Sequence, residues 1–222
     1  MEIISHRGFW NNTRGKNSVH AFDSALSSGF GIETDVRDYD GNLVISHNIP
    51  NENSQTVDSF LNSFSKSENN YNLCLAINIK SDGLQSKVKF FLEKYRIKNY
   101  FVFDMSIPDM LGYIDSGINC FIRQSEIEHD LLLIDGIKGV WLDQFKSTWF
   151  DKEILLNYLN MNIKVCVVSS ELHRRDHSLC WSILKEVVLS DEKNKGNLML
   201  CTDIPDKAKE YFYGKKRESI GV

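Results

Sequence analysis

Short apolar runs alternate with amphipathic segments along almost the whole chain, and this alternation limits the folds available to it. Runs of four to eight residues rich in Val, Ile, Leu and aromatic side chains predict strands. Eight such runs lie at residues 2–5, 32–36, 73–79, 99–104, 119–122, 138–142, 163–168 and 197–201. Segments with helical periodicity lie at 18–28, 55–66, 84–95, 107–115, 126–134, 149–160, 177–190 and 204–213. This order predicts an α/β fold, a TIM-type (β/α)8 barrel.

The length of 222 residues is short for such a barrel but falls within its range, and no shift in composition marks a linker. We therefore predict one domain over residues 1–214, followed by a frayed tail at 215–222. An open, doubly wound sheet is the alternative. It is disfavoured because no glycine-rich phosphate loop follows the first predicted strand.

The charge, the apolar runs and the cysteines of the sequence bear on whether the protein binds nucleic acid, enters a membrane or uses cysteine as a metal ligand. The formal net charge is -4, and lysines are interspersed with acidic residues, so no basic footprint for nucleic acid is present. We find no secretory leader and no apolar run approaching 18 residues, so we expect a cytoplasmic protein without membrane insertion. Five cysteines, without metal-ligand spacing, are expected to be buried reduced thiols.

Polar residues gather where the first predicted strands end. His6 and Arg7 follow the first strand, and Gly8 allows a sharp turn directly after them. Glu33 and Asp35 are two residues apart on the second strand, so both side chains project from one face. Two carboxylates on one face suit a hard divalent cation, and we therefore expect a metal site here. Ion pairing with Arg7 and Arg37 is the alternative.

Two further segments extend this group. Asp40 and Gly41 predict a hairpin turn that returns His47 toward the two carboxylates. The third strand ends in Asn78 and Lys80, where an amide oxygen can be a third metal ligand and an ammonium can meet a phosphate. A structural hydrogen bond explains Asn78 equally well.

If the barrel forms, the ends of the later strands contribute to the same face. This rule nominates Asp104, Arg123, Asp143, the stretch 169–173 and Asp203. Arg123 is a candidate second phosphate contact, and Asp143 or Gln144 a contact to a substrate hydroxyl. Structural ion pairing is as good an explanation for Arg123 and Asp143.

The first third of the chain resembles the glycerophosphodiester phosphodiesterase family. The resemblance rests on the ordered motifs His6-Arg7-Gly8, Asn17-Ser18, Glu33-x-Asp35, Asp40-Gly41 and His47. It implies a barrel, a divalent metal such as Mg, Ca or Mn, and hydrolysis of a phosphodiester. Residue by residue, it implies proton transfer by His6 and His47, phosphate contact by Arg7 and Lys80, and metal binding by Glu33 and Asp35.

Two positions depart from the family pattern. Lys16 stands where the family usually has a glutamate before its first helix, and Asn78 replaces a glutamate on the third strand. Because ligand charge helps to set cation affinity, both changes predict a more weakly held metal. Segments 76–84, 123–126 and 141–145 resemble a divergent branch from bacterial surface-polysaccharide loci, in which Asn78 would be a branch feature.

The substrate expected from the resemblance is a glycerophosphodiester or a glycan-linked phosphodiester. The attacking group is water or a hydroxyl of the substrate itself, which would give a cyclic phosphate first. A non-catalytic barrel that binds phosphate or glycan and has lost full metal binding is the alternative. Lys16 and Asn78 favour that alternative, whereas the retained histidines, arginine and carboxylates favour the enzyme.

Overall fold

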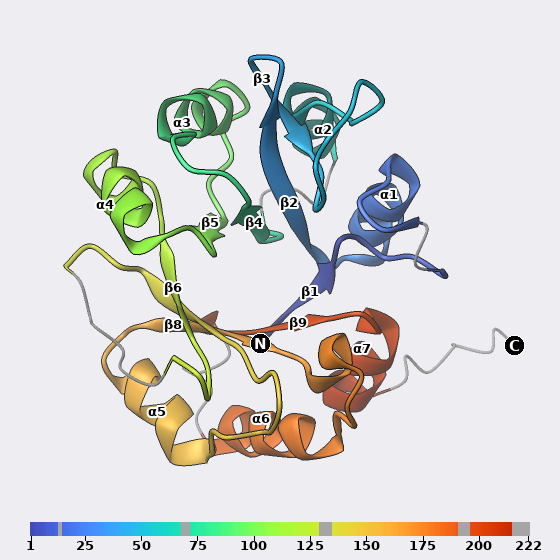
Figure 1. The fold of residues 1–222 in the computed structure, drawn as a ribbon. Helices are drawn as coiled ribbons and strands as arrows, with labels where there is room; N and C mark the ends of the chain where they lie inside the picture. The colour runs from blue at the N-terminus through green and yellow to red at the C-terminus, as the bar shows by residue number, and fades with distance from the viewer. Residues whose placement is uncertain (13–14, 68–71, 129–134, 191–195, 215–222) are drawn as a thin grey trace, which may run out of the picture.

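Eight parallel strands form the framework of the protein. The computed structural model describes residues 1–12, 15–67, 72–128, 135–190 and 196–214 (Figure 1). The parallel strands are β1 (Glu2–His6), β2 (Gly31–Tyr39), β4 (Leu75–Ile79), β5 (Tyr100–Phe103), β6 (Phe121–Gln124), β7 (Gly139–Leu142), β8 (Lys164–Val168) and β9 (Leu198–Thr202). Every predicted strand is confirmed, with bounds that differ by at most three residues.

The strands close into a barrel. Neighbouring strands pair in the order β5-β4-β2-β1-β9-β8-β7-β6. Between the two ends of this order, β5 and β6 are joined by one parallel bridge, Val102 with Cys120, and the Val102 N–H donates to the Asn119 carbonyl oxygen at 2.8 Å. We call this junction the β5–β6 seam. The predicted TIM-type barrel is confirmed.

Helices surround the strands (Figure 1). They are α1 (Val19–Ser28), α2 (Val57–Lys66), α3 (Gln85–Lys94), α4 (Ile107–Asp115), α5 (Lys152–Asn160), α6 (Ser178–Ser190) and α7 (Pro205–Tyr213), with the short 3₁₀ helix η2 (Ser170–His173) before α6. Seven predicted helices are confirmed. The helix predicted at 126–134 is not seen at 126–128, and its remaining residues lie outside the described ranges, as does the tail at 215–222. None of the helices in the described ranges combines the length and apolar character needed to cross a bilayer.

Alternation along the strands divides the apolar residues into two cores. One set packs between the strands and the helices, and the other fills the barrel interior. The interior set comprises Ile4, Cys74, Ala76, Phe101, Phe103, Phe121, Trp141, Cys166, Val168, Met199 and Cys201. Because side chains alternate along a strand, the residues two positions after these also point inward, at the carboxyl end of the barrel. All five cysteines are buried free thiols, as expected.

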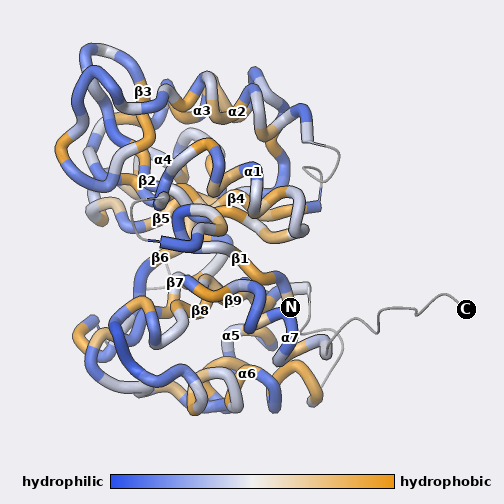
Figure 2. Tube along the Cα trace, turned by 90° about the vertical axis from the view of Figure 1, so that its right-hand side faces the viewer, coloured by the Kyte–Doolittle hydropathy of each residue, from blue (hydrophilic) through white to orange (hydrophobic). Residues whose placement is uncertain are grey.

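An antiparallel hairpin extends β2. Strand β3 (Asn42–Ile45) pairs with β2 through a turn in which Asp40 and Gly41 have φ values of 45° and 75°. Two consecutive positive φ values match the turn type preferred in two-residue hairpins. The hairpin projects from the side of the barrel away from the N-terminus (Figure 2), so its loop lies near the carboxyl ends of the strands.

The barrel interior leaves no room for a side chain at Gly139. A Cβ there would lie 2.6 Å from the Lys164 carbonyl oxygen and would also meet the Phe121 ring. We expect Gly139→Ala to lower the free energy of unfolding by about 2 kcal/mol, as overpacked cores do. Gly196→Ala is the matched control, because its Cβ would meet no described atom within 4 Å. Urea unfolding of both variants measures the difference, and equal midpoints would contradict this packing.

Candidate active site

The predicted site residues on the first three parallel strands lie close together, because side-chain alternation points them all into the carboxyl end of the barrel. On β1 His6 follows the interior residue Ile4, and on β4 Asn78 follows Ala76. Register pairs His6 with Glu33 across β1 and β2, and Asp35 with Asn78 across β2 and β4. The side chains of these four predicted site residues therefore meet at the carboxyl end of three adjacent strands.

His6 is held between two carboxylates. Its Nδ1 lies 2.6 Å from Asp203 Oδ1, and its Nε2 lies 3.8 Å from Glu33 Oε2. Burial lowers the pKa of His6, and the hydrogen bond to Asp203 partly opposes that shift. When Nδ1–H donates to Asp203, Nε2 carries the lone pair, so the ring is oriented as a proton acceptor facing the site.

Arg7 is fixed against two carboxylates of β2, Glu33 and Asp35. Its backbone N–H donates to Glu33 Oε2 at 3.2 Å, and its Nε lies 2.9 Å from Asp35 Oδ2. The residue adopts φ 58°, a left-handed conformation that is strained for arginine. Gly8 follows at φ 85°, where a Cβ would lie 2.8 Å from Ala21. The glycine thus allows the turn that brings Arg7 onto the carboxylates.

Glu33 is buried beside Asp35, and both facts raise its pKa, to about 8, with burial as the larger cause. The Glu33 side chain is 2 % exposed. Near neutral pH and without a bound cation, the folded state therefore favours a protonated Glu33. A divalent cation at this position would favour the ionised form instead.

This shift predicts a pH-dependent stability for the metal-free protein. Above about pH 4.5 the unfolded chain ionises Glu33 while the folded chain retains the proton, so Glu33 destabilises the fold increasingly until the pH reaches about 8. With chelator present, we expect Glu33→Gln to become more stable than wild type over this interval, by more than about 1 kcal/mol at pH 8. Urea unfolding at pH 5, 6.5 and 8 measures the difference, and a difference that stays constant with pH would contradict the assignment.

Two buried oxygens in this group have no hydrogen-bond partner. They are Asp35 Oδ1 and Asn78 Oδ1, which belong to residues paired in register on adjacent strands. Lys80 Nζ lies 3.7 Å from Asp35 Oδ1. Among the described residues no cluster of three or more His, Cys, Asp or Glu has the spacing of a metal site. A set of two carboxylates and one amide oxygen nevertheless fits a hard cation, and the unpartnered oxygens are the atoms it would bind.

Lys80 and Arg123 are joined through a third residue, Asp104. Lys80 Nζ lies 3.1 Å from Asp104 Oδ2, and Arg123 Nη1 pairs with Asp104 Oδ1. Arg123 also pairs with Glu128. Its pKa is raised, chiefly by the hydrogen bond to Glu128, with smaller contributions from Asp104 and Asp143. Lys80 thus belongs to the Asp35 group, whereas Arg123 reaches it only through Asp104.

His47 lies at the rim. It is exposed, its Nδ1 lies 2.9 Å from Asn48 Oδ1, and its carbonyl oxygen accepts from Arg37 Nε. The preceding residue, Ser46, donates its N–H to the Asp35 carbonyl oxygen at 3.0 Å. The hairpin therefore returns close to Asp35, as predicted, but no described contact joins the His47 side chain to the other site residues. Its proton-transfer role stays a prediction.

Two histidine–carboxylate pairs were not predicted as pairs. Asp203, which supports His6, also lies 3.3 Å from Lys16 Nζ, and Lys16 sits 4.4 Å from the Trp10 ring centroid. His173 Nε2 lies 2.7 Å from Asp143 Oδ1. The strand-end rule nominates all four residues of these two pairs, but it does not nominate Lys16. Their pairing depends on which distant strands are neighbours, and no local sequence signal reports that.

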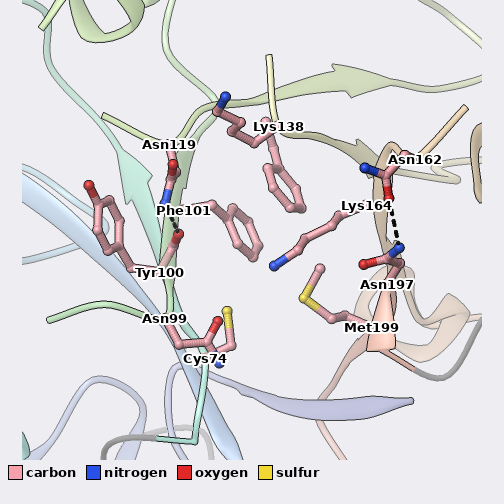
Figure 3. A pocket seen from close by; sticks show the side chains of 11 residues that line it. Cys74, Asn99, Tyr100, Phe101, Asn119, Lys138, Asn162, Lys164, Asn197 and Met199 are labelled. Atoms are coloured by element: carbon pink, nitrogen blue, oxygen red, sulfur yellow. Dashed lines mark hydrogen bonds between the residues drawn. The ribbon is translucent and has the colours of Figure 1, made fainter. Parts of the chain in front are cut away.

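A pocket of about 330 Å³ lies at the opposite end of the barrel. Its lining comes from the amino ends of strands, including Tyr100, Lys164 and Met199 (Figure 3). The surrounding asparagine amides are engaged with the protein: Asn119 Nδ2 donates to the Tyr100 carbonyl oxygen, and Asn197 to Asn162 Oδ1. In barrels of this type the chemistry occurs at the carboxyl ends, so we assign this pocket to the barrel floor.

Comparison with known proteins supports the same fold. No protein-family model and no curated protein sequence matches the chain. Solved structures do match. A protein from Galdieria sulphuraria assigned as a glycerophosphodiester phosphodiesterase has a TM-score of 0.71 at 13% identity, covering 95% of this chain and 97% of that one. A glycerophosphodiester phosphodiesterase from Agrobacterium tumefaciens has a TM-score of 0.65 at 14% identity, covering 96% and 98%.

A third structure carries a ligand. It is a phosphodiesterase from Oleispira antarctica in complex with the product sn-glycerol-3-phosphate, with a TM-score of 0.66 at 14% identity, covering 95% of this chain and 96% of that one. The chain therefore shares the barrel fold of glycerophosphodiester phosphodiesterases over nearly its full described length.

Proposed function

We propose that the protein is a phosphoric diester hydrolase that cleaves a glycerophosphodiester, or a related phosphodiester linked to a surface polysaccharide, with a divalent metal. The observation that carries the proposal is the placement of His6 between Asp203 and Glu33, next to the ion pair of Arg7 with Asp35. A proton-transfer group, a guanidinium and a pair of carboxylates share one end of the barrel. The likeness in fold to glycerophosphodiester phosphodiesterases supports the same chemistry.

The position of each residue indicates its role in the proposed reaction. His6, with Asp203 on its Nδ1, is placed to accept or return a proton at Nε2. Arg7 and Lys80 supply positive charge for the non-bridging phosphate oxygens. His47, at the rim, is the second proton-transfer group of this proposal. The attacking hydroxyl belongs to water or to the substrate, and holding a substrate hydroxyl near phosphorus makes the attack intramolecular.

Glu33, Asp35 and Asn78 would hold the metal, which when bound supplies a positive charge that stabilises the developing negative charge on the phosphate. We propose Mg, Ca or Mn, since all three bind through oxygen. The amide of Asn78 and the cation of Lys16 reduce the negative charge of the site. We therefore expect weaker metal binding than a site with an additional carboxylate would give.

A phosphate-binding barrel without catalysis is the second candidate. The observation that favours it is the saturation of the positive charges: Arg7, Lys80 and Lys16 each already contact a carboxylate. Such a protein would bind phosphate esters without turnover.

One assay separates the two candidates. Hydrolysis of bis(p-nitrophenyl) phosphate and of glycerophosphodiesters is followed with Mg, Mn or Ca, and with chelator, for wild type and His6→Ala. Turnover that requires a metal and His6 would support the hydrolase. Binding of sn-glycerol-3-phosphate without turnover of any substrate would support the binding protein and overturn the hydrolase.

A further inference from the structure

The barrel mouth has a second half, which the mechanism under "Proposed function" does not use. It is formed by the residues after β7 and by η2, the 3₁₀ helix after β8. Three contacts hold η2 across the mouth. Leu172 packs on the interior core, Glu171 Oε1 accepts the Asp203 N–H at 3.1 Å, and Arg175 Nη2 donates to the Gln144 carbonyl oxygen at 2.6 Å. The loop is therefore a fixed wall of the mouth.

His173 and Asp143 form the polar part of this wall. Asp143 points inward two residues after the interior Trp141, and its Oδ1 accepts from both the Gln144 N–H, at 2.8 Å, and His173 Nε2, at 2.7 Å. The Phe145 ring meets the imidazole edge to face, with centroids 4.9 Å apart. The side chains of His173 and Asp143 are 24 % and 10 % exposed. The pair is thus rigid and still accessible.

Two atoms of this pair have no hydrogen bond to any described residue, although Asp143 also attracts Arg123 electrostatically. Within the described part of the chain, neither Asp143 Oδ2 nor His173 Nδ1 has a hydrogen bond. With Nε2–H donating to Asp143, Nδ1 carries a lone pair, and a carboxylate oxygen accepts by nature. The wall therefore presents two adjacent acceptors next to an aromatic edge. Hydroxyl groups satisfy acceptors of this kind, whereas a phosphate oxygen, which is itself an acceptor, would be repelled.

We propose that Asp143 and His173 bind two neighbouring hydroxyls on the alcohol released from the phosphodiester, so that the protein prefers a polyol or sugar leaving group. This inference rests on the proposed hydrolase function and names its substrate class. The phosphate lies on the β1, β2 and β4 side, near Arg7, Lys16 and Lys80. The leaving alcohol then extends toward β7 and β8, where each acceptor receives one O–H.

The test compares two substrates that differ only in hydroxyls. Glycerophosphoinositol carries vicinal hydroxyls on its ring, and glycerophosphocyclohexanol has the same ring without them. We expect wild type to prefer the first, and His173→Ala or Asp143→Asn to lower the ratio of the two kcat/KM values about tenfold, the effect of one lost hydrogen bond of moderate strength. His20→Ala, on the exposed face of α1, should leave the ratio unchanged. A variant ratio equal to that of wild type would overturn the proposal.

Measuring the binding of both compounds tests the hydroxyl site independently of whether the protein is a hydrolase. If neither compound is cleaved, calorimetric titration of both intact compounds tests the hydroxyl site by binding alone, while the assay under "Proposed function" decides on the hydrolase. Tighter binding of glycerophosphoinositol that is lost in His173→Ala would still support the hydroxyl site. Equal binding of the two compounds by wild type would overturn it. Circular dichroism of each variant shows whether the fold is retained, and Asp143→Asn, which preserves side-chain shape, covers the case in which His173→Ala unfolds.

Discussion

Replacing His6 by alanine is expected to lower kcat/KM for phosphodiesters about 10³-fold, the middle of the range for removing a general acid or base. The reason is geometric: His6 is a partly buried imidazole whose two nitrogens face Asp203 and Glu33. Asp203→Asn should also lower kcat/KM by about 10³-fold or more, because asparagine keeps the shape of the side chain but favours the wrong imidazole tautomer and no longer stabilises the imidazolium. Initial rates at saturating metal measure both variants.

The pH profile adds a second readout for His6. Burial lowers its pKa, so the proton-accepting form persists at lower pH than for an ordinary histidine. If His6 acts as base in the rate-limiting step, the midpoint of the acid limb of the kcat/KM profile should lie below about pH 6.5, the pKa of an ordinary histidine. His20→Ala is the control, since this histidine is exposed on α1. A His6→Ala enzyme within twofold of wild type would remove His6 from the mechanism.

Asp35→Ala is expected to be among the most destabilising single changes at the mouth, by about 3 kcal/mol. The carboxylate is fully buried, faces Arg7 and Lys80, and accepts from Asn17 Nδ2 at 2.9 Å. Removing one partner of a buried ion pair leaves the remaining charge uncompensated, which costs about 3–5 kcal/mol when both partners are fully buried. The lower figure applies because the Arg7 side chain is 20 % exposed.

Urea unfolding of Asp35→Ala, compared with Asp38→Asn, tests this expectation. Asp38 lies on the same strand, is exposed, and accepts from Ser81 Oγ at 2.7 Å, so its change should stay within about 0.5 kcal/mol. If Asp35 also binds the cation, Asp35→Asn should abolish the rise in melting temperature that Mg, Ca or Mn gives to wild type. Similar losses at positions 35 and 38 would show that the buried ion pairs contribute little.

The fold was predictable because its signals are local and repeated. Each strand is a short apolar run, Thr56 accepts from the Ser59 N–H to cap α2, and Gly29 ends α1 at φ 75°. Strand alternation also placed Glu33 and Asp35 on one face, and the structure brings them together with His6 and Arg7. Local sequence is sufficient when the relevant neighbours lie on one strand or in one turn.

The remaining parts of the site depend on long-range neighbours and side-chain direction. His6 and Asp203 are 197 positions apart and meet only because β1 lies between β2 and β9. Asp143 and His173 meet through the packing of η2 on the barrel mouth. The hairpin position of His47 was predictable, but the direction of its side chain depends on the twist beyond β3. Sequence spacing carries no information about that direction.

The β5–β6 seam gives the ion pair of Arg123 with Asp104 a meaning beyond substrate contact. The backbone ladder between these two strands is a single bridge, and the ion pair spans the same junction at the mouth, one partner following β5 and the other on β6. The ion pair therefore stabilises the contact between β5 and β6 at the β5–β6 seam. An anion that drew Arg123 away from Asp104 would loosen that contact, so occupancy of the mouth and the cohesion of the barrel wall would be mechanically linked.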